Sequence, residues 1–342
     1  MKTLRFSLFG VAAALAAFSF GSAAFAEEAA DPQQPPAPTQ PATQPAAQPA
    51  AQPAAPPADE KGPPLPFITI EGQGGGAFTP MAYLVNPAGE CATWGKPSVA
   101  YDYIGLGRKN LDALMITENL LGRVEFGFAA DRLGLGTLPT DINTAEGIPD
   151  LINNSDVWMY NFSTRFLMVK ENSNDLKWLP AITFGADLKY NADIASINSK
   201  LGGALTNIGY DHDTSVDFTL TATKTVAKGF FGKPLILTAG LRESQGADLG
   251  FLGFSDKYTA SFEGSVAILP FEKVLLAYEF RQKSSPYGTI PTLIGDENNW
   301  HGFDIAYIID KHTTIVAGLG LFGNLANTDA NDAWWLQLKY EF

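Results

Sequence analysis

Histidines are the side chains in this sequence that could act as a base near neutral pH or bind a transition metal. His212 stands between Asp211 and Asp213, whereas His301 and His312 lie near the ends of apolar segments. Lipases built into membrane barrels use a Ser–His pair held by Asn, and no histidine here has that spacing. A zinc site needs at least three spaced protein ligands, which only neighbouring loops could bring together. We therefore expect no enzymatic activity, no metal site and no cofactor.

Glycines form a second candidate motif, Gly72-Gln73-Gly74-Gly75-Gly76, which is followed by residues 77–80. A phosphate-binding loop needs Lys and then Ser or Thr after its glycines, and both are missing. Glycine permits close approach of another backbone and positive φ. We interpret 71–80 as packing inside the mouth of a barrel or forming a first irregular strand.

The N-terminus has the features of a secretory signal. Lys2 and Arg5 precede an apolar stretch from Phe6 to Phe20, and Ala24-Phe25-Ala26 has the small-x-small pattern of a cleavage site. The apolar stretch is about 15 residues long, short of the roughly 20 that a transmembrane helix needs. We predict a signal peptide over residues 1–26.

Residues 27–66 consist almost wholly of Ala, Pro, Gln and acidic residues, a composition that favours extended polyproline II over a packed core. We predict a disordered linker there, and a contact with the cell wall is a further hypothesis. The single cysteine, Cys91, excludes an internal disulfide. Without residues 1–26 the chain keeps 21 of its 23 bases and all 36 acids. This acidic balance argues against nucleic-acid binding.

From Phe67 onward, apolar and polar residues alternate over segments of about ten residues, which is the pattern of transmembrane strands. Most connections alternate between short and long, as in membrane barrels. The short link near Gly105 to Arg108 breaks that pattern. We predict an all-β fold over 67–342, a transmembrane antiparallel up-and-down barrel of about 12 strands (10–14). The expected strands lie near 98–105, 109–118, 123–132, 157–169, 180–190, 215–225, 234–243, 258–268, 273–282, 301–309, 313–321 and 333–342.

One face of these segments carries almost no charge, with Lys224 the clearest exception. A charge that faces lipid at mid-bilayer costs roughly 2–4 kcal/mol, which explains the depletion. Aromatic residues near segment ends would form girdles at the two membrane interfaces, and these are Trp158, Tyr190, Trp300, Trp334 and Tyr340. The other face mixes charges with small residues that suit a narrow lumen. The expected lumen-lining residues are Asp102, Asp112, Arg123, Glu125, Arg165, Asp187, Lys189, Asp217, Arg242, Glu263, Glu279, Arg281, Asp304 and Lys339.

The last segment ends on an aromatic residue and carries aromatic or apolar residues at every second position before it. It resembles the C-terminal targeting signal of bacterial outer-membrane proteins, which implies recognition by the barrel-assembly machinery. Together with the export signal, it predicts a Gram-negative outer membrane, with lipid around the barrel and the linker in the periplasm. The expected signal residues are Trp334, Leu336, Leu338, Tyr340 and Phe342.

The run from Glu71-Gly72 to Pro80 is similar to the opening of an uncharacterised, porin-like family of bacterial outer-membrane proteins, known only as a domain of unknown function. The resemblance implies the barrel but no activity and no functional residues. We expect a porin or channel that passes small polar solutes. Acids outnumber bases on the lumen face, which predicts a mild cation preference. The alternatives are a closed barrel with a structural or anchoring role, plugged by the glycine-rich segment 72–76, and an enzyme at the barrel rim.

Overall fold

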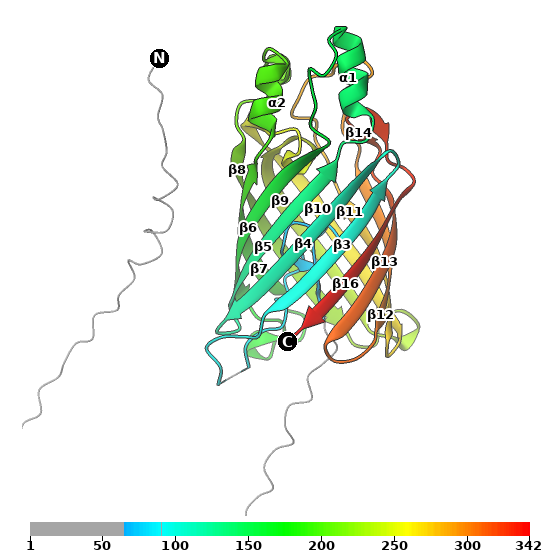
Figure 1. Ribbon diagram of the computed structural model, residues 1–342. Coiled ribbons are helices and arrows are strands. Elements are labelled where there is room, and N and C mark those ends of the chain that lie inside the picture. The colour runs from blue at the N-terminus through cyan, green and yellow to red at the C-terminus, as the bar shows by residue number, and fades with distance from the viewer. Residues whose placement is uncertain (1–64, 90) are drawn as a thin grey trace, which may run out of the picture. The chain divides into compact units, whose positions relative to one another are not determined.

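The computed structural model describes residues 65–89 and 91–342, and their dominant element is a closed barrel of twelve antiparallel strands (Figure 1). Each of the twelve expected segments overlaps one strand of the barrel, so the predicted fold class and strand number are confirmed. The predicted signal peptide and nearly all of the predicted linker lie outside the described residues. The strands are β3 (Ser98–Leu106), β4 (Lys109–Leu120), β5 (Val124–Gly134), β6 (Asp156–Val169), β7 (Ala181–Asn191), β8 (Thr214–Val226), β9 (Leu235–Gly246), β10 (Phe254–Phe271), β11 (Val274–Arg281), β12 (Trp300–Ile308), β13 (Thr313–Leu321) and β16 (Ala333–Glu341).

Each strand of the barrel pairs with its neighbours in sequence, and the last pairs with the first. The closing register runs from Trp334 opposite Gly105 to Glu341 opposite Ser98. Closure matters because hydrocarbon offers no hydrogen-bond partner to a free strand edge. The barrel therefore pairs the backbones of its strands without leaving an open edge.

The two ends of the barrel differ, and we call them the turn end and the loop end. Short connections join the strands at the turn end, where the chain also enters β3 and leaves β16; the 3₁₀ turns η1 (Ser173–Asp175) and η2 (Phe230–Gly232) belong to these connections. Figure 1 shows the helices gathered at the opposite end, the loop end. There the connections include α1 (Leu138–Glu146), α2 (Ile194–Lys200), α3 (Ala204–Ile208), the 3₁₀ turn η3 (Ala247–Gly250) and the hairpin of β14 (Asn324–Leu325) with β15 (Thr328–Asp329).

The exception at the loop end is the link between β3 and β4, which is only Gly107 and Arg108. Gly107 has φ of +65°, in the left-handed region that glycine adopts at little cost. The short link that broke the sequence pattern is therefore a tight hairpin turn on the side that otherwise carries longer connections.

The outer surface of the barrel is apolar along the strands. Phe162 in the middle of β6 is 52% exposed and Leu336 of β16 is 49% exposed, and the next residues along each strand point inward and are buried. Among the described residues, no helix combines the length and hydropathy required to cross a bilayer. An exposed apolar belt on a closed barrel is the surface of a protein that crosses a membrane with strands.

The prediction that Trp300 belongs to an aromatic girdle is wrong. Its side chain is 5% exposed and packs inside the barrel against Phe78 and Phe322, with ring centroids 5.8 and 4.7 Å away. Edge-to-face and tilted ring contacts of this kind stabilise aromatic clusters. The other four aromatic residues, Trp158, Tyr190, Trp334 and Tyr340, are on the outer face.

The outer belt gives a direct test of the membrane-spanning assignment. Phe162→Arg places a charge in the middle of the belt, and we expect it to lower the free energy of unfolding by roughly 2–4 kcal/mol. The matched control, Phe231→Arg, changes an 86% exposed side chain in η2 at the turn end and should have little effect. Equilibrium unfolding in urea from lipid vesicles measures both. Equal effects of the two substitutions would contradict a lipid-facing belt.

Candidate functional site: a plugged lumen

Residues 65–89, which we call the plug, run into the barrel and return to its turn end, where Pro87 and Gly89 are exposed. Every residue from 66 to 82 is buried, and the segments β1 (Phe67–Ile68) and β2 (Gly74–Gly75) pair with each other. The plug starts near the turn end, where Lys339 donates to the carbonyl of Pro66. The glycine-rich segment 71–80 therefore occupies the lumen.

Glu279 of β11 binds the turn of the plug at residues 76–79. Its carboxylate accepts the N–H groups of Ala77 (2.6 Å), Phe78 (3.3 Å) and Thr79 (2.7 Å), as well as the hydroxyl of Thr79. A Cβ at Gly76 would overlap this carboxylate, so a larger residue there would displace it. A carboxylate that accepts several N–H groups forms charge-assisted bonds, which are the stronger kind.

A second carboxylate holds the other side of the plug. Glu125 of β5 accepts the N–H groups of Gly74 (2.9 Å) and Val85 (2.6 Å). Arg165 of β6 pairs with Glu125 at 2.8 Å and donates to the carbonyls of Gly74 (2.7 Å) and Met81. Both members of this ion pair thus also form hydrogen bonds with the backbone of the plug.

Glu71 is the charged side chain that the plug itself brings into the lumen. Its carboxylate pairs with Lys189, with Arg242 at 3.0 Å and with Arg281 at 2.8 Å. All four side chains are at most 3% exposed. Removing one partner of a buried ion pair typically costs 3–5 kcal/mol. This network therefore fixes the position of the plug along the barrel wall. The wall carboxylates that complete the network are Asp217 and Glu263.

Close backbone contact supplements the charges. A Cβ at Gly127 of β5 would overlap the carbonyl oxygen of Gly72, and the Ser163 hydroxyl donates to that same oxygen at 3.0 Å. Gly72 has φ of +77°, which favours glycine. Glycines on both the plug and the wall therefore allow the two backbones to touch.

The fourteen expected lumen residues differ in how deeply they are buried, and one of them does not face the lumen. Arg123 is half-buried near the turn end and donates to the carbonyl of Leu167 at 3.1 Å. The other inward-facing residues are at most 5% exposed. These are Asp102, Glu125, Arg165, Asp187, Lys189, Asp217, Arg242, Glu263, Glu279, Arg281, Asp304 and Lys339.

The prediction for Asp112 is wrong, because its side chain is on the outer face of β4. It lies directly opposite Tyr103, which is also exposed, and it accepts a hydrogen bond from Tyr101 at 2.6 Å. Arg132 is 3.8 Å away. Asp112 is near the loop end, where an outward charge costs much less than at mid-bilayer.

Sequence reasoning missed the buried interior acids Glu71 and Asp131 as candidate site residues. Asp131 shares the inward side of β5 with Glu125, so the two-residue period could have found it. Glu71 gave only a weak signal, its position beside the glycine cluster, because its partners are more than 100 residues away in sequence.

The expected targeting residues Trp334, Leu336, Leu338, Tyr340 and Phe342 are all exposed on the outer surface. His212 lies in a loop at the loop end and contacts Asp211 at 2.9 Å, with both side chains about half exposed. Within residues 65–89 and 91–342, His, Cys, Asp and Glu side chains form no group of three or more that could hold a metal. The lumen is therefore the site with the densest buried polar contacts.

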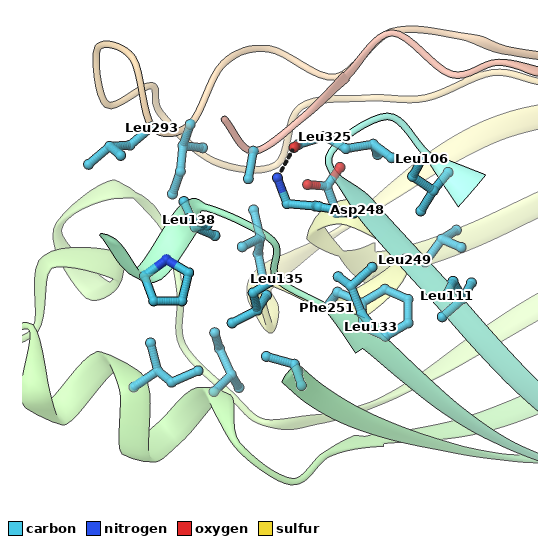
Figure 2. A pocket seen from close by; sticks show the side chains of 18 of the residues that line it. Leu106, Leu111, Leu133, Leu135, Leu138, Asp248, Leu249, Phe251, Leu293 and Leu325 are labelled. Atoms are coloured by element: carbon cyan, nitrogen blue, oxygen red, sulfur yellow. Dashed lines mark hydrogen bonds between the residues drawn. The ribbon is translucent and has the colours of Figure 1, made fainter. Parts of the chain in front are cut away.

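A cavity of about 220 Å³ lies between the plug and the loop end (Figure 2). Ile70, Ala77 and Phe78 of the plug contribute to its lining, together with inward residues of the strands and residues of the loop-end connections. Most of the lining is aliphatic or aromatic. The interior is therefore divided into a polar region around the plug and an apolar chamber next to it.

The role of Glu279 in anchoring the plug can be measured by amide hydrogen exchange. Glu279→Gln keeps the shape of the side chain but removes its charge, and a hydrogen bond to a charged group contributes roughly 1.5–3 kcal/mol. We expect the amides of Ala77 and Thr79 to exchange about 10- to 100-fold faster. The control Glu243→Gln alters an exposed, outward carboxylate of β9. Unchanged protection in Glu279→Gln would contradict the anchoring role.

The model of the family described as "Protein of unknown function (DUF3034)" matches residues 66–339. No curated protein matches the sequence. Among solved structures, the chain is similar to the KdgM porin (11% identity, TM-score 0.43, 72% of this chain and 99% of that one). It is also similar to the NanC porin (7%, 0.42, 72% and 98%) and to Omp33 of Acinetobacter baumannii (8%, 0.38, 73% and 99%). Because the family match covers residues 66–339, which include all of the barrel except the last two residues of β16, the chain belongs to the DUF3034 family of proteins of unknown function.

Proposed function

We propose that this protein is a channel-type barrel of a Gram-negative outer membrane, in which the plug closes the lumen and solutes pass when the plug is displaced. The observation that supports a closed resting state is the burial of residues 66–82 inside the barrel. The wall contacts of Glu71, Glu125 and Glu279 hold this segment in place.

The outer-membrane assignment is supported by the apolar belt and by the difference between the two ends. In bacterial outer-membrane barrels, short turns face the periplasm and longer loops face outward. The turn end, where the plug begins and β16 ends, would then face the periplasm, and so would the linker. In this proposal, lipid surrounds the belt and the barrel-assembly machinery binds the C-terminal strand.

The solutes we propose are small and polar, with a mild preference for cations. Several wall aspartates have a carboxylate oxygen without a hydrogen-bond partner among the described protein groups. Once the plug leaves, the lumen loses Glu71, but the wall keeps an excess of acids over bases. A pore lined by excess carboxylates attracts cations. The aspartates with such an oxygen are Asp102, Asp131, Asp187, Asp217 and Asp304.

A closed barrel with a structural or anchoring role is the second candidate. The number of buried contacts between plug and wall favours it, because a plug held by Glu71, Glu125 and Glu279 is costly to move. The two candidates differ in one property. A gated channel opens when the contacts between the plug and the wall are weakened, whereas a scaffold does not open.

Planar-bilayer recordings separate these candidates. We expect the full chain to be silent or to open rarely, because the plug fills the lumen. Deletion of residues 67–89 should give stable conductance steps, and Glu279→Gln should raise the fraction of time open in a barrel that keeps its plug. Heat-shifted mobility on a gel controls for folding. Silence of both variants after insertion would contradict the channel.

The same recordings test the cation preference of the plug-deleted barrel. In a salt gradient, we expect a reversal potential on the cation-selective side, because acids exceed bases along the wall. Replacing Asp131 and Asp187 with Asn should move that potential toward zero, whereas the outward control Glu243→Gln should leave it unchanged. A reversal potential on the anion-selective side would contradict the proposal.

A further inference from the structure

The chamber at the loop end has apolar walls. A route for polar solutes through this part of the barrel would need polar walls. Within β5 the inward side changes from Asp131 to Leu133, and within β6 it changes from Asn161 to Val157 toward the loop end. Leu111 of β4 continues the apolar wall. The change from polar to apolar inward residues is therefore confined to the part of the strands nearest the loop end. It does not extend through the whole lumen.

The loop-end connections complete the chamber with the same kind of side chain. Figure 2 shows Leu138 from α1, Leu249 and Phe251 from the connection between β9 and β10, and Leu293 around the same space as the strand leucines. Leu138, Leu249 and Phe251 are each less than 9% exposed. Three separate loop-end connections thus contribute apolar side chains to the same space as the strands.

The charged groups near the chamber are already engaged or stand at its edge. The Lys109 ammonium donates to the carbonyl of Leu325 at 3.2 Å and also to Asn327 and Thr328. These three bonds use all the donors of an ammonium group.

The two acids of the lining do not offer a strong charge either. Burial and the nearby Glu297 carboxylate raise the pKa of Asp248 to about 7. Glu146, at the end of α1, is exposed to solvent. Apart from Glu146 at its solvent-exposed edge, the lining therefore consists of apolar side chains and polar groups that are already engaged or buried.

The size of the chamber indicates the size of its ligand. An apolar cavity of about 150 Å³ stays dry and binds benzene. The chamber measures about 220 Å³, which scales to about nine or ten carbon atoms. A dry cavity also loses dispersion contacts along its whole lining, so an apolar occupant is favoured.

We infer that the chamber at the loop end is a binding site for a neutral, largely hydrocarbon small molecule, held directly above the plug. Its geometry fits one molecule of about bicyclic size, with at most one uncharged polar group. The site goes beyond the proposed channel, because binding does not require the plug to move.

The test uses naphthalene and the protein in lipid nanodiscs, with isotope-labelled Ile and Leu methyl groups observed by NMR. We expect saturable shifts at Ile152, Ile197 and Leu205, which line the chamber, and only a linear change at the lipid-facing Leu114 and Leu336. The second set reports partitioning of the probe into lipid within the same sample.

Two substitutions that fill the chamber supply the matched comparison. Leu138→Trp and Ile197→Trp come from different loop-end helices and leave the strands unchanged, so each should weaken naphthalene binding by at least about tenfold. Leu276→Trp adds the same ring on the outer face and should have no effect. Replacing naphthalene with 1-naphthoate should also weaken binding at least tenfold, because the carboxylate would lose its hydration.

Three results would overturn the inference. The first is a linear response of the chamber methyl groups that matches the lipid-facing ones. The second is equal naphthalene affinity in Leu138→Trp, Ile197→Trp and the parent chain. The third is nuclear Overhauser contact between lipid acyl chains and the chamber methyl groups before the probe is added, which would identify bilayer lipid as the occupant. Because the test does not depend on conductance, it can fail while the channel proposal holds, and the reverse is also possible.

Discussion

Buried backbone N–H groups inside the barrel need acceptors, and this requirement shapes the whole interior. The plug is too short and too irregular to satisfy its own amides, since β1 and β2 are only two residues each. Glu125 and Glu279 of the wall supply the acceptors that the plug lacks. In turn, the amides and hydroxyl of the plug help to offset the cost of burying these two carboxylates. Wall and plug are therefore energetically dependent on each other.

This dependence changes the meaning of the charged lumen. Rows of charge on inward faces of strands usually indicate a water-filled pore. Here Arg165, Arg242 and Arg281 are engaged with carboxylates and with the plug, and they are at most 3% exposed. The charges hold a closed structure in the described conformation. Any passage must first replace those contacts with water or solute, and the free energy of that exchange would determine how often the barrel opens.

The fold could be predicted in detail because a membrane barrel repeats one local rule, a two-residue alternation, in every strand. The rule fails near the loop end, where inward-facing residues become apolar like the outward-facing ones. β4 has apolar residues on both sides at its loop end, with Leu111 facing the chamber and Leu114 facing lipid, so the side of Asp112 was ambiguous. The abundance of aromatics in girdles favours an outer position for Trp300, yet it belongs to a ring cluster with Phe78.

The site was less predictable than the fold, because its contacts are long-range. Glu279 and Ala77 are 202 positions apart, and nothing local to either residue indicates the other. The two-residue period identified which wall residues face inward, but it could not show whether water or the glycine-rich segment meets them. The apolar chamber is not predictable from the sequence for a related reason. Its lining comes from many elements, and each contributes only one or a few residues.

The occupied lumen is most directly tested by the reactivity of a thiol placed within the plug. Gln73 is 1% exposed, and its side-chain amide has no hydrogen-bond partner among the described residues, so Gln73→Cys removes no such contact. The natural Cys91 is exposed and serves as the internal standard. With a charged maleimide added to the full chain in lipid vesicles, the structure predicts rapid labelling of Cys91 and strong protection of the thiol introduced by Gln73→Cys. Equal labelling rates at the two positions would contradict a plug that fills the lumen.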